Sequence, residues 1–198
     1  QVHNDAQVSV HSDFEDVAAF IGQVLRSFAH HAPAEALLVF KHHPLDRGYT
    51  DYQRLIDGLA HELRVRDRVL YIHDQHLPTL LAHARGAVVI NSTVGLSAIH
   101  QGVPTMVLGR AFYDFDGLTW QGGLAEFWRC AAEARPDPDL YQRFRRWVIW
   151  RTQINDNFYA PIRAPARADH PVLRRLPARA RLDPRCDQGS ADPERALG

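Results

Sequence analysis

Four short apolar runs, each separated from the next by a segment with helical spacing, constrain the fold of this chain more than any other feature. The runs are continuous rather than alternating in polarity, which is typical of strands buried on both faces of a parallel sheet. They occupy residues 36–40, 69–72, 87–90 and 105–108. Because parallel strands need crossover connections, the sequence predicts an α/β fold, with a Rossmann-like parallel sheet covered by helices.

Helical periodicity and composition divide the rest of the chain. Apolar residues recur at helical spacing over residues 13–30, with Asp13 in the N-cap region, and residues 110–123 form an aromatic loop. Residues 164–198 are rich in Pro, Arg, Ala and Asp and lack a core-forming pattern. The sequence therefore predicts a nucleotide-sugar-binding domain over residues 1–163 and a disordered tail over 164–198. Further helices are predicted over residues 50–64, 77–84, 94–101 and 138–154.

Polar side chains gather where two of the predicted strands end. The first run is followed by Lys-His-His-Pro over residues 41–44, and the third by Asn-Ser-Thr-Val-Gly over residues 91–95. The carboxyl ends of parallel strands share one edge of a sheet, where ligands of such folds bind. Cationic groups, hydroxyls and the start of a helix together favour an anionic ligand, as in a nucleotide-sugar. The candidate binding residues are Lys41, His43, Asn91, Ser92, Thr93 and Gly95.

Plainer interpretations of these segments stay open. Residues 41–44 could be a solvated strand end, and residues 91–93 could be an ordinary helix cap. The presence of both at neighbouring strand ends favours a binding site. His73 closes the second strand and could either lie beside the same ligand or serve the loop. Asp114 and Asp116 are interpreted as turn formers, and binding of a hydroxyl or a metal is the alternative.

Charge and cysteine content narrow the classes of function. Lys plus Arg and Asp plus Glu each number 23, which argues against a general nucleic-acid-binding protein. The 12 histidines form no compact metal-binding pattern, and Cys130 and Cys186 are too far apart for a zinc ribbon or a disulfide framework. No apolar run approaches the roughly 20 residues that span a bilayer. The chain begins without Met or a signal-like segment, so a fragment of a longer cytoplasmic protein is expected.

Taken in order, the motifs resemble the capsular polysaccharide biosynthesis family, whose members are bacterial β-Kdo glycosyltransferases that use CMP-Kdo. The resemblance covers roughly residues 1–160 and implies the C-terminal, donor-binding domain of a GT-B glycosyltransferase, without the N-terminal acceptor domain. Gln1–Asp5 resembles a Gln-x-x-x-Asp segment of that family, which implies a catalytic role for Asp5. The resemblance also implies that His43, Ser92 and Thr93 face the cytidine monophosphate, with Lys41 nearby. It rests on residues 41–44, 91–96, 102–104, 109–114 and 117–119.

The activity that this resemblance implies is transfer of Kdo from CMP-Kdo to a lipid or Kdo acceptor, with retention of configuration and Asp5 as nucleophile or base. No metal or other cofactor is expected beyond the donor substrate. The expected partners are the donor, a lipid or glycan acceptor, the inner membrane surface and capsule assembly proteins, but not nucleic acid. The expected location is the cytoplasm, peripheral to the inner membrane, and the chain alone is expected to transfer Kdo poorly.

Two other functions stay open. The chain could be a non-catalytic nucleotide- or glycan-binding module that assists export of the capsule polysaccharide. It could also be a GT-B enzyme with a uridine donor, but the glutamate that usually binds the ribose hydroxyls is not evident near Ser92.

Overall fold

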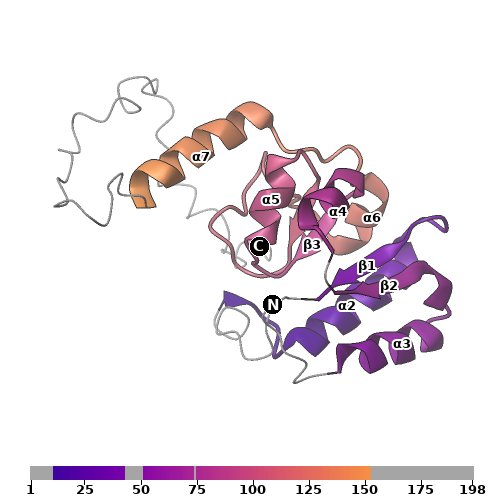
Figure 1. Cartoon of the computed structure of the whole chain (residues 1–198). Coiled ribbons are helices and arrows are strands. Elements are labelled where there is room, and N and C mark those ends of the chain that lie inside the picture. The colour runs from indigo at the N-terminus through magenta and orange to yellow at the C-terminus, as the bar shows by residue number, and fades with distance from the viewer. Residues whose placement is uncertain (1–10, 43–50, 74, 153–198) are drawn as a thin grey trace, which may run out of the picture. The chain divides into compact units, whose positions relative to one another are not determined.

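The computed structural model describes residues 11–42, 51–73 and 75–152, and the description below concerns these residues (Figure 1). The chain forms two units, Gln1–Phe144 and Arg145–Gly198, and each is described by itself. Asp5 and His43 lie outside the described residues, as do the predicted domain boundary at residue 163 and the predicted tail, so these stay predictions.

All four described strands pair in parallel, in two separate two-stranded ladders (Figure 1). Leu38 lies opposite Val69 in the first ladder, and Ala87 lies opposite Thr105 in the second. The predicted α/β class is confirmed, although the described strands do not share one continuous ladder. The strands are β1 (Leu38–Lys41), β2 (Val69–Ile72), β3 (Ala87–Val89) and β4 (Thr105–Val107).

Every helix that the sequence predicts is present, with small shifts at its ends. The short α6 lies in the region after the aromatic loop, where no helix was predicted, because seven residues are too few for a clear apolar period. A 3₁₀ turn, η1, precedes β2. The elements are α2 (Val17–His31), α3 (Tyr52–Glu62), η1 (Arg66–Arg68), α4 (Leu77–His83), α5 (Val94–His100), α6 (Leu124–Cys130) and α7 (Pro138–Thr152).

The start of α2 differs from the prediction. Its N-cap is Asp16, whose carboxylate accepts a hydrogen bond of 2.7 Å from the backbone N–H of Ala19. Asp13 was predicted in the cap region, but its carboxylate instead pairs with the Arg110 guanidinium at 2.9 Å. The Asp13 carboxylate, which the local sequence pattern placed at the helix cap, therefore binds Arg110, which lies 97 residues away in the sequence.

Helix α2 lies at the centre of the core of the first unit. Its Leu25 belongs to an apolar cluster with Ile56 of α3, and its Val24 belongs to another with Phe127 of α6. Leu38 and Phe40 of β1 pack against both clusters. Figure 1 shows α2 and α3 together along one side of β1 and β2. The two ladders are therefore joined by packed side chains.

A third apolar cluster packs α4 and α5 together next to β3. It contains Leu81 of α4 and Ala98 of α5, with Ala87 of β3 packed against it. Gly102 ends α5 with a φ of 72°, a left-handed conformation that favours glycine, and the chain then turns into β4.

Helix α7 begins in the first unit and continues into the second. Asp137 caps it, because its carboxylate accepts hydrogen bonds from the backbone N–H groups of Asp139 (2.8 Å) and Leu140 (3.0 Å). Phe144 is buried, and its ring centroid lies 5.4 Å from that of Phe115 in the aromatic loop. The first turns of α7 therefore pack on that loop.

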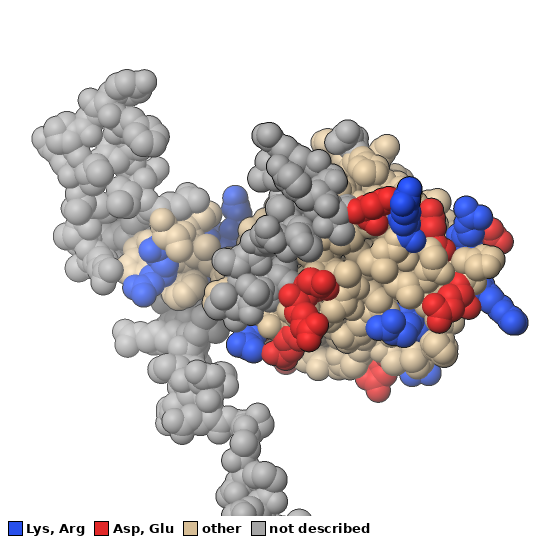
Figure 2. All heavy atoms as spheres, turned by 90° about the horizontal axis from the view of Figure 1, so that it is seen from below, with Lys and Arg blue, Asp and Glu red and all other residues tan. Residues whose placement is uncertain are grey.

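Charged side chains are mixed over the face that Figure 2 presents. Lys and Arg side chains are scattered there among Asp and Glu side chains, several of which form one small adjacent group. Among residues 11–42, 51–73 and 75–152, no helix is both long enough and apolar enough to cross a membrane.

Replacing Asp16 by Ala should lower the free energy of unfolding by about 1 kcal/mol, because it removes the acceptor that caps α2. Asp13→Ala is the matched control, because it removes the same group and breaks only an exposed ion pair. Its loss should be smaller. Urea denaturation of the 198-residue chain measures the free energy of unfolding of both variants. An equal or larger decrease for Asp13→Ala would show that Asp13, not Asp16, caps α2.

Candidate functional site

The Asn91–Gly95 segment lies where the second ladder ends. The ladder continues one step beyond the assigned strands, because the Gly109 N–H donates to the Ile90 carbonyl at 2.8 Å. Asn91 therefore begins the loop at the carboxyl edge of β3, directly beside the residues that follow β4. This is the place in an α/β fold where ligands bind.

The beginning of the described chain reaches the same edge. The carbonyl of His11 accepts hydrogen bonds from the Arg110 N–H (2.7 Å) and from Nδ2 of Asn91 (3.4 Å). A Cβ added to Gly109 would lie 3.0 Å from that carbonyl oxygen and 2.9 Å from the side chain of Ile90. Asn91 and Arg110 thus hold His11 against the edge, and Gly109 leaves room for its carbonyl. The Asn91 contact spans 80 residues of sequence.

Ser92 forms the turn that leads into α5. Its hydroxyl oxygen accepts a hydrogen bond of 3.2 Å from the Val94 N–H, so the predicted cap-like role is real for Ser92. A serine hydroxyl can also donate one hydrogen bond. Within the described parts of the chain, no acceptor for that proton is found. The Ser92 O–H is therefore positioned by the turn and still able to donate to a ligand.

Thr93 differs from Ser92 although the two are adjacent. It occupies the N-cap position of α5, but its side chain makes no capping hydrogen bond and is exposed. The interpretation as an ordinary N-cap therefore does not account for the Thr93 hydroxyl. Among the described residues, neither of these hydroxyls has an acceptor for its proton, so both can donate to a polar ligand at the edge.

Gly95 lies beneath the ring of Tyr113. A Cβ added to Gly95 would lie 2.8 Å from two ring carbons, so no larger residue fits without displacing the ring. The Tyr113 hydroxyl donates to the carbonyl of Ser92. Burial, together with the neighbouring Asp114 carboxylate, raises the pKa of Tyr113 above its usual range. The phenol therefore stays protonated and donates at physiological pH.

The aromatic loop that carries Tyr113 is held by its own polar contacts. The Asp114 carboxylate accepts hydrogen bonds from the Thr119 hydroxyl (2.7 Å) and from Nε2 of Gln121 (3.2 Å). The Trp120 N–H donates to the Thr105 carbonyl of β4 at 2.8 Å. Asp114 thus stabilises the loop, as its interpretation as a turn former predicted. The described residues contain no cluster of His, Cys, Asp or Glu that could hold a metal ion.

The other predicted strand end carries Lys41 and a group of aromatic and imidazole rings. Lys41 ends β1, and its ammonium donates to the His42 carbonyl at 3.3 Å. The His42 ring contacts the Tyr71 hydroxyl through Nδ1, and its centroid lies 4.8 Å from that of His73. Lys41, His42 and His73 thus meet at the carboxyl end of the first ladder. Over the described ranges, no hydrogen bond joins Lys41 to Ser92.

Several residues of the site were not found from the sequence. Tyr113 was part of the predicted loop but was not assigned a role, and Tyr71 was regarded only as part of a strand. One signal for Lys41 was overlooked: it is the only lysine in the sequence, where every other basic residue of this class is Arg. An ammonium and a guanidinium are not interchangeable, so a lone lysine at a strand end indicates a specific use.

Gly95→Ala should lower the free energy of unfolding by about 1–3 kcal/mol, because the new Cβ overlaps the ring of Tyr113. Gly58→Ala, in the exposed part of α3, is the matched control, because nothing lies within 4 Å of its added Cβ. That variant should be more stable than the wild type by up to about 1 kcal/mol, since Ala favours a helix. Thermal denaturation compares them, and a shift of both in the same direction would contradict the packing of Tyr113 on Gly95.

Comparison with known proteins places the chain among capsule proteins. It is 45% identical over 159 residues to the capsule polysaccharide export protein KpsS of Escherichia coli, covering 80% of this chain and 40% of KpsS. It is 47% identical over 166 residues to the capsule polysaccharide modification protein LipB of Neisseria meningitidis, covering 83% of this chain and 39% of LipB. Protein FixF of Sinorhizobium fredii is 30% identical over 165 residues. No solved structure matches the chain.

The chain spans about two fifths of the length of these relatives. A family profile described as "Capsule polysaccharide biosynthesis protein" matches residues 1–159, and this range includes both strand ends of the candidate site. The chain therefore belongs to the capsule polysaccharide biosynthesis protein family.

Proposed function

We propose that this chain is the donor-binding part of a glycosyltransferase that transfers Kdo from CMP-Kdo to a lipid or glycan acceptor during capsule polysaccharide biosynthesis. The observation that carries the proposal is the turn at Ser92 and Thr93. It presents two hydroxyls that can meet a ligand, at the carboxyl edge of a parallel ladder, in a chain of a capsule biosynthesis family.

The chemistry of this edge matches an anionic donor. CMP-Kdo is negatively charged at its phosphate and at the carboxylate of its sugar. In the proposed complex, the Ser92 and Thr93 hydroxyls donate to phosphate oxygens, and Lys41 and His43 offset the negative charge. Hydrogen bonds to charged groups are stronger than those between neutral groups, so a few such contacts suffice to orient the donor.

The same groups serve the reaction step. As the bond between Kdo and CMP breaks, negative charge grows on the departing phosphate. Hydroxyl and ammonium groups already in place then bind more strongly than they bound the intact donor, and this difference accelerates the step. Asp5 is proposed as nucleophile or base at the anomeric carbon, and no cofactor beyond the donor is invoked. The acceptor is expected at the cytoplasmic face of the inner membrane.

A binding module that assists polysaccharide export is the second candidate. The Escherichia coli relative is named as an export protein, which favours this candidate. The two functions share a binding site but differ in chemistry, so donor binding without any transfer in a chain extended with an upstream acceptor domain would support the module.

The chain should bind CMP more tightly than UMP. Ser92→Ala combined with Thr93→Ala should weaken CMP binding by about 1–3 kcal/mol, because each hydroxyl is proposed to donate to the charged phosphate. Isothermal titration of the 198-residue chain measures both affinities. Equal or tighter binding of UMP would contradict the cytidine donor.

Thr79→Ala is the matched control for that double variant. Thr79 is an exposed hydroxyl in the first turn of α4, which follows β2 as α5 follows β3. It should leave CMP affinity unchanged. Wild-type CMP affinity in the Ser92 and Thr93 double variant would show that the two hydroxyls do not bind the ligand and only shape the turn.

The 198-residue chain alone should transfer Kdo poorly, whereas a chain extended with an upstream acceptor domain should transfer it. Acceptor positioning contributes a large part of the rate, with effective molarities of about 10⁵ M or more. Asp5→Asn should abolish transfer in the extended chain, because it removes the charge and most of the nucleophilicity. The assay is Kdo incorporation into a lipid acceptor, read by mass spectrometry.

Asp13→Asn is the control for Asp5→Asn, because it removes a second carboxylate from the same segment and should leave transfer largely intact. Robust turnover by the 198-residue chain would refute the need for an acceptor domain. Full transfer activity of the extended Asp5→Asn variant would show that Asp5 is neither nucleophile nor base in the reaction.

A further inference from the structure

Tyr113 makes two separate contacts with the turn that begins α5. Its side chain is 1% exposed, and its hydroxyl donates to the carbonyl of Ser92. Its ring lies against the α carbon of Gly95, where even a methyl group would overlap it. One side chain thus holds the turn at its first residue and again three residues later.

The hydrogen bond to Ser92 has an electrostatic consequence. The Ser92 carbonyl also accepts the Gly95 N–H at 2.9 Å, so both of its lone pairs are used. A carbonyl oxygen without these donors would repel a phosphate that approached the turn. With two donors bound, its partial negative charge is offset and the plane of the Ser92–Thr93 peptide is fixed.

The element that carries Tyr113 is itself anchored to the second ladder. The Asp114 carboxylate closes the loop through Thr119 and Gln121, and the Trp120 N–H donates to the carbonyl of Thr105 in β4. The neighbouring Phe112 is 62% exposed, whereas Tyr113 is buried together with Leu118 and Thr119 of the same loop. The loop therefore presents the tyrosine to the turn from a fixed base.

We propose that Tyr113 is a positioning residue of the donor site, which holds the Ser92–Thr93 turn so that its hydroxyls face a nucleotide phosphate. Tyr113 does not touch the ligand; it acts through the Ser92 carbonyl and the backbone at Gly95. This inference rests on the proposed function, because the site that Tyr113 supports is the proposed donor site.

The test is Tyr113→Phe in the 198-residue chain, titrated with CMP. The ring stays in place, and only the hydrogen bond to Ser92 is lost. CMP affinity should fall about tenfold, the change expected from roughly one hydrogen bond. Hydrogen exchange at the Val94 and Gly95 amides should become faster, because these N–H groups bond to Ser92 within the same turn.

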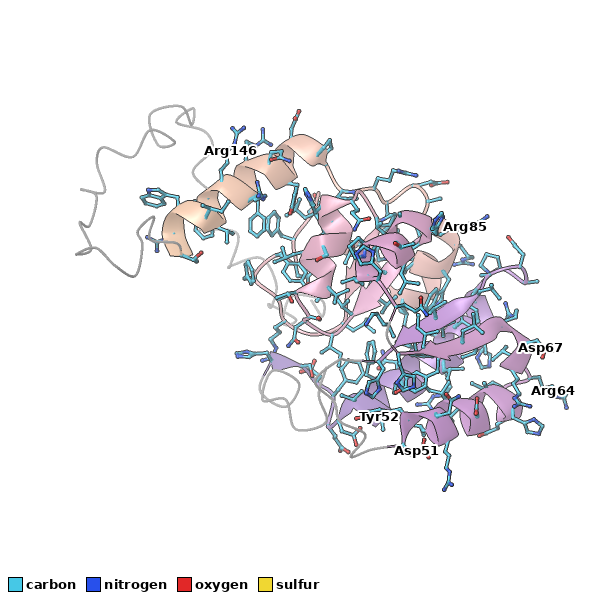
Figure 3. All side chains as sticks on the ribbon, viewed as in Figure 1. Asp51, Tyr52, Arg64, Asp67, Arg85 and Arg146 are labelled. Atoms are coloured by element: carbon cyan, nitrogen blue, oxygen red, sulfur yellow. The ribbon has the colours of Figure 1, made fainter. Side chains whose placement is uncertain are left out.

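Tyr52→Phe is the matched control. Tyr52 is also a buried tyrosine, 4% exposed, but it belongs to the cluster around α2 and α3. Figure 3 labels it at the start of α3, far from α5 in that view. The control should keep wild-type CMP affinity even if its melting temperature falls as much as that of Tyr113→Phe. A role in stability alone would not separate the two variants in this way.

A double-mutant cycle sharpens the test. If Tyr113 acts through the turn, Tyr113→Phe added to Ser92→Ala and Thr93→Ala should weaken CMP binding much less than it does alone. Additive losses, or wild-type CMP affinity in Tyr113→Phe, would overturn the inference while leaving the proposed function intact.

The two proposals fail in different ways. If the wild-type chain does not bind CMP, the proposed donor is wrong, and amide exchange then decides the role of Tyr113. Unchanged exchange at Val94 and Gly95 in Tyr113→Phe would show that the tyrosine does not position the turn. Faster exchange confined to these amides would support its positioning role.

Discussion

Apolar packing around α2 holds the described fold together, because no ladder of backbone hydrogen bonds joins β1 and β2 to β3 and β4. Val24, Leu25 and Phe28 of this helix are almost completely buried. Full burial of each such side chain stabilises the fold by about 1.5–3 kcal/mol. The buried face of α2 contacts α3 in one apolar cluster and α6 in another, and β1 packs against both of these clusters. The carboxyl edges of the two ladders, which carry the candidate site, depend on this packing for their positions.

The site at the second ladder is built from segments that are distant in sequence. The turn at Ser92 depends on a tyrosine 21 residues later, and Asn91 holds the chain at His11, 80 residues earlier. Hydrogen bonds within the 110–123 loop keep that tyrosine in place. A substitution in the loop would therefore disturb the turn at Ser92 without being part of it. This arrangement is common where binding groups must be held before the ligand arrives.

The match to the capsule polysaccharide biosynthesis family covers both strand ends of the candidate site. The named relatives are described by export and by modification, and the chain covers about two fifths of their length. Under the proposed function, donor binding would need only the local groups at the strand ends, whereas transfer would also need a positioned acceptor. The proposed binding and the proposed transfer are therefore tested by separate measurements, and the 198-residue chain suffices for the binding measurement.

The sequence by itself determined the elements and the residue types at the strand ends. The limits of β2 could be predicted without error, and Lys41 and Ser92 could be placed where strands end, because short apolar runs and local turn chemistry act over a few residues. Only the tertiary structure decided that Asp16 rather than Asp13 caps α2, that Gly95 makes room for a tyrosine, and that the strands form two ladders. The pairing of Asp13 with Arg110, the packing of Tyr113 on Gly95 and the strand pairing all involve residues far apart in the chain. Local periodicity contains no information about such partners, since they are selected by the packing of the whole unit.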